Sequence, residues 1–269
     1  MVKISAVGGY FDTSMLVFIS VLSLFSMTVP IPVAAEENNV NIQQSKQISN
    51  SDSEIIEIEN IEVEPAVVRD VSIPPVTGNI PPLVYRIPTS QPIVFLTIDD
   101  GNYKDQSVID SLVANNIKAS VFLAQDFVHG NTEFFKQLSD KGYPIENHTI
   151  THDLWMTHRM NKQQQAAEIC GMADYEQQNF GRRPIFFRPP GGNYNGATMA
   201  ASGECGMRAV VTWTAEARGG VMYYQDDDKL KPGDIVLMHF RPEFAADLQA
   251  FINAKNAAGL KTDLLENWL

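Results

Sequence analysis

Cysteine and basic residues are scarce in this chain of 269 residues, and each scarcity narrows what the protein can be. The two cysteines, Cys170 and Cys205, form no Cys-x-x-Cys pattern, which argues against a thiolate metal site or a redox motif. They can form one disulfide bond or remain two buried thiols, and the sequence favours neither. Lysine and arginine number 20 against 32 acidic residues, and the formal net charge of -12 argues against a nucleic-acid partner.

The negative charge is concentrated in one N-terminal stretch. Residues 36–70 hold nine acidic and two basic side chains, a local net charge of -7, which leaves -5 for the rest. Residues 36–90 are rich in Glu, Asn, Gln, Ser and Pro, which is typical of an acidic linker. Within it, the alternation over 54–64 would also fit an edge strand. We predict a spacer over 36–90 and a domain over 91–269.

An apolar run precedes this linker. Residues 15–29 are followed by Pro-Ile-Pro-Val-Ala-Ala, which is typical of a secretory signal cleaved before Glu36. Counted through Val33, the run is nearly long enough to span a bilayer, so residues 1–35 are predicted to be a signal peptide or a membrane anchor. Prolines and serines interrupt the run and favour the cleaved signal. Either way, the remainder is expected to be secreted or at the cell surface, where a disulfide is allowed.

From residue 92 on, strand-like and helix-like segments alternate. Strands are expected at 93–98, 119–124, 143–146, 185–187, 209–212 and 235–238, and helices at 106–116, 132–141, 163–180, 197–204 and 244–258. Repeated strand–helix units predict an α/β fold with a parallel sheet, open or closed into a barrel.

Two adjacent acids, Asp99 and Asp100, follow the first of these strands and precede Gly101. Neighbours on a strand point to opposite faces, so acids in mid-strand would bury one carboxylate at a cost of several kcal/mol. We therefore expect the strand to end here, with both carboxylates at the rim where sites of α/β folds are built. Taken alone, the pair is more typical of an ordinary turn that ends the strand.

Histidine and arginine stand at three further strand ends. His148 and His152 are four residues apart, which puts both rings on one face of a helix or turn, as a shared metal ion requires. Arg188 opens a loop rich in proline and glycine, and His239 ends the strand at 235–238. Each of these residues is weak evidence alone. Because titratable or charged side chains follow four predicted strands, a shared catalytic site explains them better than four unrelated surface or core positions.

These segments, in this order, resemble the motifs of the polysaccharide deacetylase family, also called the NodB homology domain or carbohydrate esterase family 4. The resemblance covers about residue 92 to the C-terminus. Thr97-Ile98-Asp99-Asp100-Gly101 is similar to the first motif, Thr-Phe-Asp-Asp-Gly, and His148-Thr149-Ile150-Thr151-His152 to the second. Arg188-Pro189-Pro190-Gly191-Gly192 is similar to the third, usually Arg-x-Pro-Tyr-Gly, and Leu237-Met238-His239 to the fifth.

The resemblance implies a role for each matched residue. Asp99 would be the catalytic base and His239 the catalytic acid, and the metal ligands would be Asp100, His148 and His152. Arg188 would orient the base. The backbone N–H of Gly191, which stands where the family has tyrosine, would help to bind the oxyanion.

The fourth motif, Asp-x-x-Asp-Trp, is where this chain departs from the family. Glu216 stands at the first Asp, and Gly219 and Gly220 stand at the second Asp and the Trp. The family uses an acid here to tune the catalytic histidine, so Glu216 is expected to raise the pKa of His239. The groove wall that the family's tryptophan makes is expected to be absent, and Trp213 is expected in the core.

The implied fold is a distorted (β/α) barrel, and the implied activity is metal-dependent hydrolysis of acetyl groups on a polysaccharide substrate. The favoured substrate is an N-acetylglucosamine-type cell-wall polymer, peptidoglycan or chitin-like, and the favoured metal is zinc, with cobalt or nickel as alternatives. Two other functions stay open: an O-acetyl esterase acting on xylan-like polysaccharide, and a non-catalytic carbohydrate-binding relative with a degenerate fourth motif. Retention of the base, the acid and all three ligands argues against the binding protein. The sequence does not set the oligomeric state.

Overall fold

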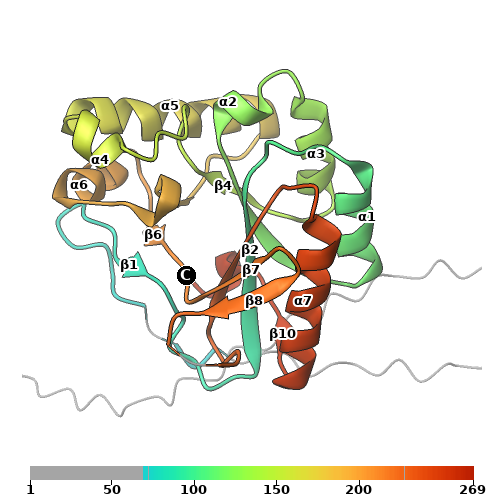
Figure 1. The fold of residues 1–269 in the computed structure, drawn as a ribbon. Helices are drawn as coiled ribbons and strands as arrows, with labels where there is room; N and C mark the ends of the chain where they lie inside the picture. The colour runs from blue at the N-terminus through green and yellow to red at the C-terminus, as the bar shows by residue number, and fades with distance from the viewer. Residues whose placement is uncertain (1–68, 72, 227) are drawn as a thin grey trace, which may run out of the picture. The chain divides into compact units, whose positions relative to one another are not determined.

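The computed structural model describes residues 69–71, 73–226 and 228–269. Ten strands in these residues form one curled sheet, with helices along its outside (Figure 1). The strands are β1 (Leu83–Val84), β2 (Ile93–Asp100), β3 (Ala119–Leu123), β4 (Ile145–Asn147), β5 (Phe186–Phe187), β6 (Ala209–Val211), β7 (Ala215–Arg218), β8 (Val221–Tyr224), β9 (Ile235–His239) and β10 (Lys261–Thr262).

The strand order is β1-β6-β5-β4-β3-β2-β9-β7-β8, with β10 beside β2. Every pairing is parallel except that of β7 with β8. The helices are α1 (Gln106–Ala114), α2 (Gln125–Val128), α3 (Thr132–Asp140), α4 (Met156–Arg159), α5 (Lys162–Phe180), α6 (Gly196–Glu204) and α7 (Phe244–Ala257), with 3-10 turns at Pro190–Gly192 and Leu265–Asn267. The prediction of an α/β fold, a distorted (β/α) barrel, is confirmed.

The strand β2 separates two apolar cores because its side chains alternate between the two faces of the sheet. Val94, Leu96 and Ile98 pack outward against α1, α3 and α7. Phe95 points inward, where Trp268 packs edge-on against it with ring centroids 5.7 Å apart. The C-terminal residues thus fill the interior of the curled sheet, and the chemistry is confined to the ends of the strands.

The sheet includes residues from the predicted linker. β1 pairs with β6, and Ile87 is fully buried and donates its backbone N–H to the carbonyl of Gly233, 2.8 Å away. The compact part of the chain therefore begins before the predicted boundary at residue 91. The structure also describes residues 69–71 and 73–82 of the predicted linker. The predicted signal or anchor at 1–35, the strand considered at 54–64 and the remaining linker residues lie outside the described residues.

Cys170 on α5 and Cys205 at the end of α6 form a disulfide bond. It joins the two helices that pack over β4, β5 and β6. Of the two alternatives that the sequence left open, the structure has the bridge. Among the helices of the described residues, none is long and apolar enough to cross a membrane.

Candidate active site

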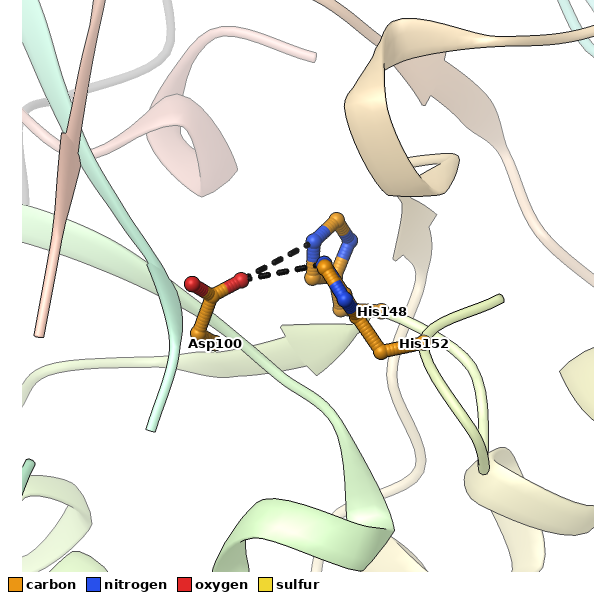
Figure 2. A group of neighbouring side chains, drawn as sticks. All are labelled: Asp100, His148 and His152. Atoms are coloured by element: carbon orange, nitrogen blue, oxygen red, sulfur yellow. Dashed lines mark ion pairs between the residues drawn. The ribbon is translucent and has the colours of Figure 1, made fainter. Parts of the chain in front are cut away.

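Three side chains from the ends of β2 and β4, the strands on either side of β3, meet at the rim of the sheet. Oδ1 of Asp100 lies 3.1 Å from Nε2 of His152 and 3.6 Å from Nε2 of His148. Figure 2 shows this carboxylate facing both imidazoles. The ligand atoms of the three residues all lie within 4.8 Å of one another, and within the described residues they are the one group of this kind.

The local backbone makes this meeting possible. Asp100, Thr149 and His152 all have positive φ, of 81°, 74° and 55°, a conformation that costs most residues energy and clusters at functional sites. Neighbouring residues on a strand point to opposite faces, so Asp99 and Asp100 would normally face apart. The turn at Asp100 lets both carboxylates reach the site. The segment from His148 to His152 is a loop, and Glu168 on α5 accepts backbone N–H bonds from Ile150 and Thr151 that hold it.

The donor set fits a divalent metal ion. Nδ1 of His148 lies 2.7 Å from the carbonyl oxygen of Arg188, so the ring donates there and leaves the lone pair of Nε2 facing the site. Oδ1 of Asp100 is buried and accepts no hydrogen bond from the described residues. Two imidazoles and one carboxylate that converge in this way are what a catalytic zinc site with an open position uses.

Opposed electrostatic effects set the charges of these groups. Burial acts to raise the pKa of Asp100, but the imidazoles of His148 and His152 outweigh it and hold that pKa well below its usual range. Burial acts to lower the pKa of His148, but the carboxylates of Asp99 and Asp100 outweigh it and raise that pKa. Acid should therefore protonate His148 in competition with metal binding.

Asp99 is held by a buried arginine. Nη1 of Arg188 donates to Oδ1 of Asp99 and to Oγ1 of Thr97, both at 2.7 Å. The guanidinium is completely buried and stacks 4.3 Å from the centre of the Phe122 ring. Oδ2 of Asp99 lies 3.6 Å from Nε2 of His148, so one carboxylate oxygen is anchored and the other faces the metal-ligand cluster.

His239 stands next to Asp99, because β9 pairs with β2 in the register that puts these two residues opposite each other. Its Nδ1 is buried, has no hydrogen bond to any described residue, and lies 3.9 Å from Oε1 of Glu216 on β7. Burial lowers the pKa of His239, against the raising effect of Asp99, Asp100 and Glu216. Glu216 thus acts in the predicted direction, but the expectation of a raised pKa is wrong because desolvation outweighs the carboxylates.

One cavity of about 310 Å³, here called the site cavity, is lined by Asp99, Asp100, His148, His152, Glu216 and His239. Gly191 also lines it, in a turn where its φ is 62°. Leu154, Arg218 and Arg241, which no sequence motif indicates, also line the cavity from loops and a hairpin. The sequence prediction placed Trp213 in the core, whereas that ring is half-buried and lines the cavity. The β-strand pattern of Ala215–Arg218 was the signal that could have revealed the hairpin.

A family model described as polysaccharide deacetylase matches residues 86–210. An uncharacterised protein of Streptomyces coelicolor is 33% identical over 196 residues, which are 71% of this chain and 78% of that protein. This chain belongs to the polysaccharide deacetylase family. The matched region includes the two acids of β2, His148, His152 and Arg188, and of the candidate residues only His239 and Glu216 lie beyond it.

Two further relatives describe the range of this family. A peptidoglycan-N-acetylglucosamine deacetylase of Bacillus cereus is 29% identical over 167 residues, covering 58% of this chain and 76% of that protein. A solved structure of a family 4 pseudoenzyme from Bacillus anthracis superposes with a TM-score of 0.60 at 20% identity, covering 70% of this chain and 68% of that one. The fold is therefore common to active and inactive members, and activity has to be argued from the residues of the site.

Proposed function

We propose that this protein is a metal-dependent hydrolase that removes N-acetyl groups from an N-acetylglucosamine-type polymer of the cell wall, outside the cytoplasm. The observation that carries the proposal is the combination of a three-ligand cluster with a separate carboxylate, Asp99, held in place by Arg188. The similarity to a peptidoglycan deacetylase of Bacillus cereus supports this choice of substrate.

The ligand cluster would supply the electrophilic part of the chemistry. A divalent ion held by Asp100, His148 and His152, with zinc favoured by the donors, would lower the pKa of its water to about 7 and polarise the acetyl carbonyl. Asp100, His148 and His152 would act only as metal ligands.

The remaining residues move the protons. Asp99, with one oxygen fixed by Arg188, takes the proton of the water that attacks the acetyl carbon. The backbone N–H of Gly191 binds the carbonyl oxygen as negative charge develops on it. His239 donates a proton to the leaving amine.

The test is acetate release from N-acetylglucosamine oligomers by the purified protein, with its metal content measured in parallel. We expect acetate to disappear on chelation and to return with added zinc or cobalt. Asp99→Asn should keep the metal and lose about 10²- to 10⁴-fold in turnover. His148→Ala should lose the metal, while the matched variant of an exposed histidine, His129→Ala, should lose neither.

The same assay separates the alternatives. Metal-dependent acetate release from acetylated xylan, with none from N-acetylglucosamine oligomers, would make the protein an O-acetyl esterase. Bound metal and oligomer binding without acetate from either polymer would make it a carbohydrate-binding relative. Full activity of Asp99→Asn would refute the assignment of the base.

A further inference from the structure

The loop that carries both candidate histidine ligands, residues 148–152, is here called the ligand loop. Each of its five backbone N–H groups donates a hydrogen bond. Those of the first, second and fifth residues find acceptors on β3, on β4 and within the loop itself. Those of Ile150 and Thr151 both donate to Oε2 of Glu168 on α5, at 3.1 and 2.9 Å, and the hydroxyl of Thr151 donates to the same oxygen at 3.1 Å. The middle of the ligand loop thus depends on one carboxylate from a separate element.

The backbone of the ligand loop needs such a hold because it is strained. Thr149 and His152 have φ of 74° and 55°, on either side of the two residues that bond Glu168. Residues other than glycine keep a positive φ only where the surrounding contacts fix it. The imidazoles of His148 and His152, whose ring centroids lie 4.8 Å apart, both face Asp100 (Figure 2). Without the carboxylate of Glu168, the backbone between the two rings would relax and their spacing would no longer be fixed.

The helix α5 presents Glu168 from a fixed position. Cys170, two residues further along α5, is bonded to Cys205, so α5 is joined covalently to the end of α6. The carbonyl of Ile169 accepts the side-chain N–H of Asn147 at 2.7 Å, which joins α5 to the end of β4. Because these contacts hold the helix, the carboxylate is pre-placed for the ligand loop.

We propose that Glu168 is a positioning residue for the two histidine ligands and acts through the backbone between them. It sets the spacing of His148 and His152, and through that spacing the affinity for the metal ion. This inference rests on the proposed function, because that function assigns the ligand loop to metal binding. Groups that orient the ligands of a metal site typically contribute about 10- to 100-fold in metal affinity.

The reach of the Glu168 side chain and its charge can be separated by substitution. Aspartate keeps the charge on a side chain that is one methylene shorter, so it falls short of the two N–H groups. Glutamine keeps the length and loses the charge, and its amide oxygen can accept both N–H bonds. A positioning role therefore predicts that glutamine substitutes for Glu168 and that aspartate does not, whereas a long-range attraction between the carboxylate and the metal predicts the reverse.

The test measures the zinc affinity of the full chain by competition with a chromophoric chelator, and the visible absorption of the cobalt-loaded protein. We expect Glu168→Asp to weaken zinc binding about 10- to 100-fold and to shift the cobalt bands. Glu168→Ala should do the same, so the loss can be measured even if one of these two variants fails to fold. Glu168→Gln should retain most of the zinc affinity and the cobalt bands of the wild-type protein.

Asp174→Ala is the matched control, because Asp174 is an exposed acid on the same helix and pairs with Arg183 at the surface. It should change neither zinc affinity nor the cobalt bands. Wild-type zinc affinity in Glu168→Asp and Glu168→Ala would overturn the proposal. A loss in Glu168→Gln as large as in Glu168→Asp, or an equal loss in the Asp174 variant, would do the same.

Acetate release by the wild-type protein is scored separately, so that this inference and the proposed function can fail independently. Acetate release together with unchanged zinc affinity in Glu168→Asp would refute only the positioning role. Zinc affinity that depends on the reach of Glu168, without acetate release, would support the positioning role and refute the hydrolase. A wild-type protein that binds no zinc or cobalt would refute both.

Discussion

The ion pair of Arg188 and Asp99 offers the sharpest test of how the site is built. Arg188→Met removes a buried guanidinium that contacts Asp99 and Thr97 at 2.7 Å and the carbonyls of Val211 and Thr212 at 3.3 Å. It leaves the Asp99 carboxylate buried and unpaired. Removing one partner of a buried pair costs about 3–5 kcal/mol, so we expect a loss of about 4 kcal/mol in the free energy of unfolding.

Most of that loss should be the penalty of an uncompensated charge, and a double-mutant cycle can show this. In the double variant Arg188→Met/Asp99→Asn no charge is left unpaired, so it should recover about 2 kcal/mol relative to Arg188→Met alone. The assay is urea unfolding followed by circular dichroism in chelator, since bound metal would add its own stabilisation.

An exposed ion pair supplies the control for this cycle. Arg183 contacts Asp174 at the surface, and Arg183→Met should cost less than about 1 kcal/mol. If the double variant at the site is destabilised by the sum of its two single changes, the pair carries no coupling and the reasoning is refuted.

Three further predictions concern stability and pH. Glu216→Gln should move the alkaline limb of kcat/KM to lower pH, because it removes a carboxylate 3.9 Å from Nδ1 of His239; a limb that stays in place would contradict this. Replacing both Cys170 and Cys205 with alanine opens a bridge that spans 35 residues and should cost about 4 kcal/mol in unfolding free energy, which a loss below about 1 kcal/mol would disprove. Glu176 is fully buried, neither of its carboxylate oxygens accepts a hydrogen bond from the residues that the structure describes, and burial raises its pKa well above the usual value. Since the folded state binds this proton more tightly, stability falls as pH rises from about 4.5 towards the folded pKa. Glu176→Met should therefore stabilise the protein by about 1–3 kcal/mol at pH 8 and flatten the pH dependence, and equal unfolding curves for both proteins at that pH would contradict it.

The sequence predicted the elements whose signal is local. The apolar run before Asp99, the stripes of the long helices and the glycine that ends α5 are read from neighbouring residues, and the structure has these elements within about two residues of the predicted bounds. Strand ends of a parallel sheet share one edge, so the ends could also be expected to bring the candidate residues together.

Features that depend on distant partners could not be predicted in this way. Leu83–Val84 lies just after two prolines and looks like linker, but its pairing with Ala209–Val211 makes it a strand. Asp100 and His152 have positive φ in the folded chain because of the loop contacts around them. The residue types alone do not predict this conformation. The pKa of His239 likewise depends on how deeply the folded chain buries the ring, which no motif reports.

Trp213 shows why a missing motif residue need not leave a missing wall. The sequence predicted that the groove would lack an aromatic wall, because Gly220 stands where the family has tryptophan. The indole of Trp213 nevertheless lines the site cavity. The guanidinium of Arg188 lies 5.6 Å from its ring, and Gly192 leaves room beside it. A substrate contacts the side chains that line the groove, whatever their position in the sequence. An aromatic side chain from another part of the chain can therefore form the wall. The departure from the fourth motif therefore changes where the aromatic wall comes from, and by itself it is no argument that the site is inactive.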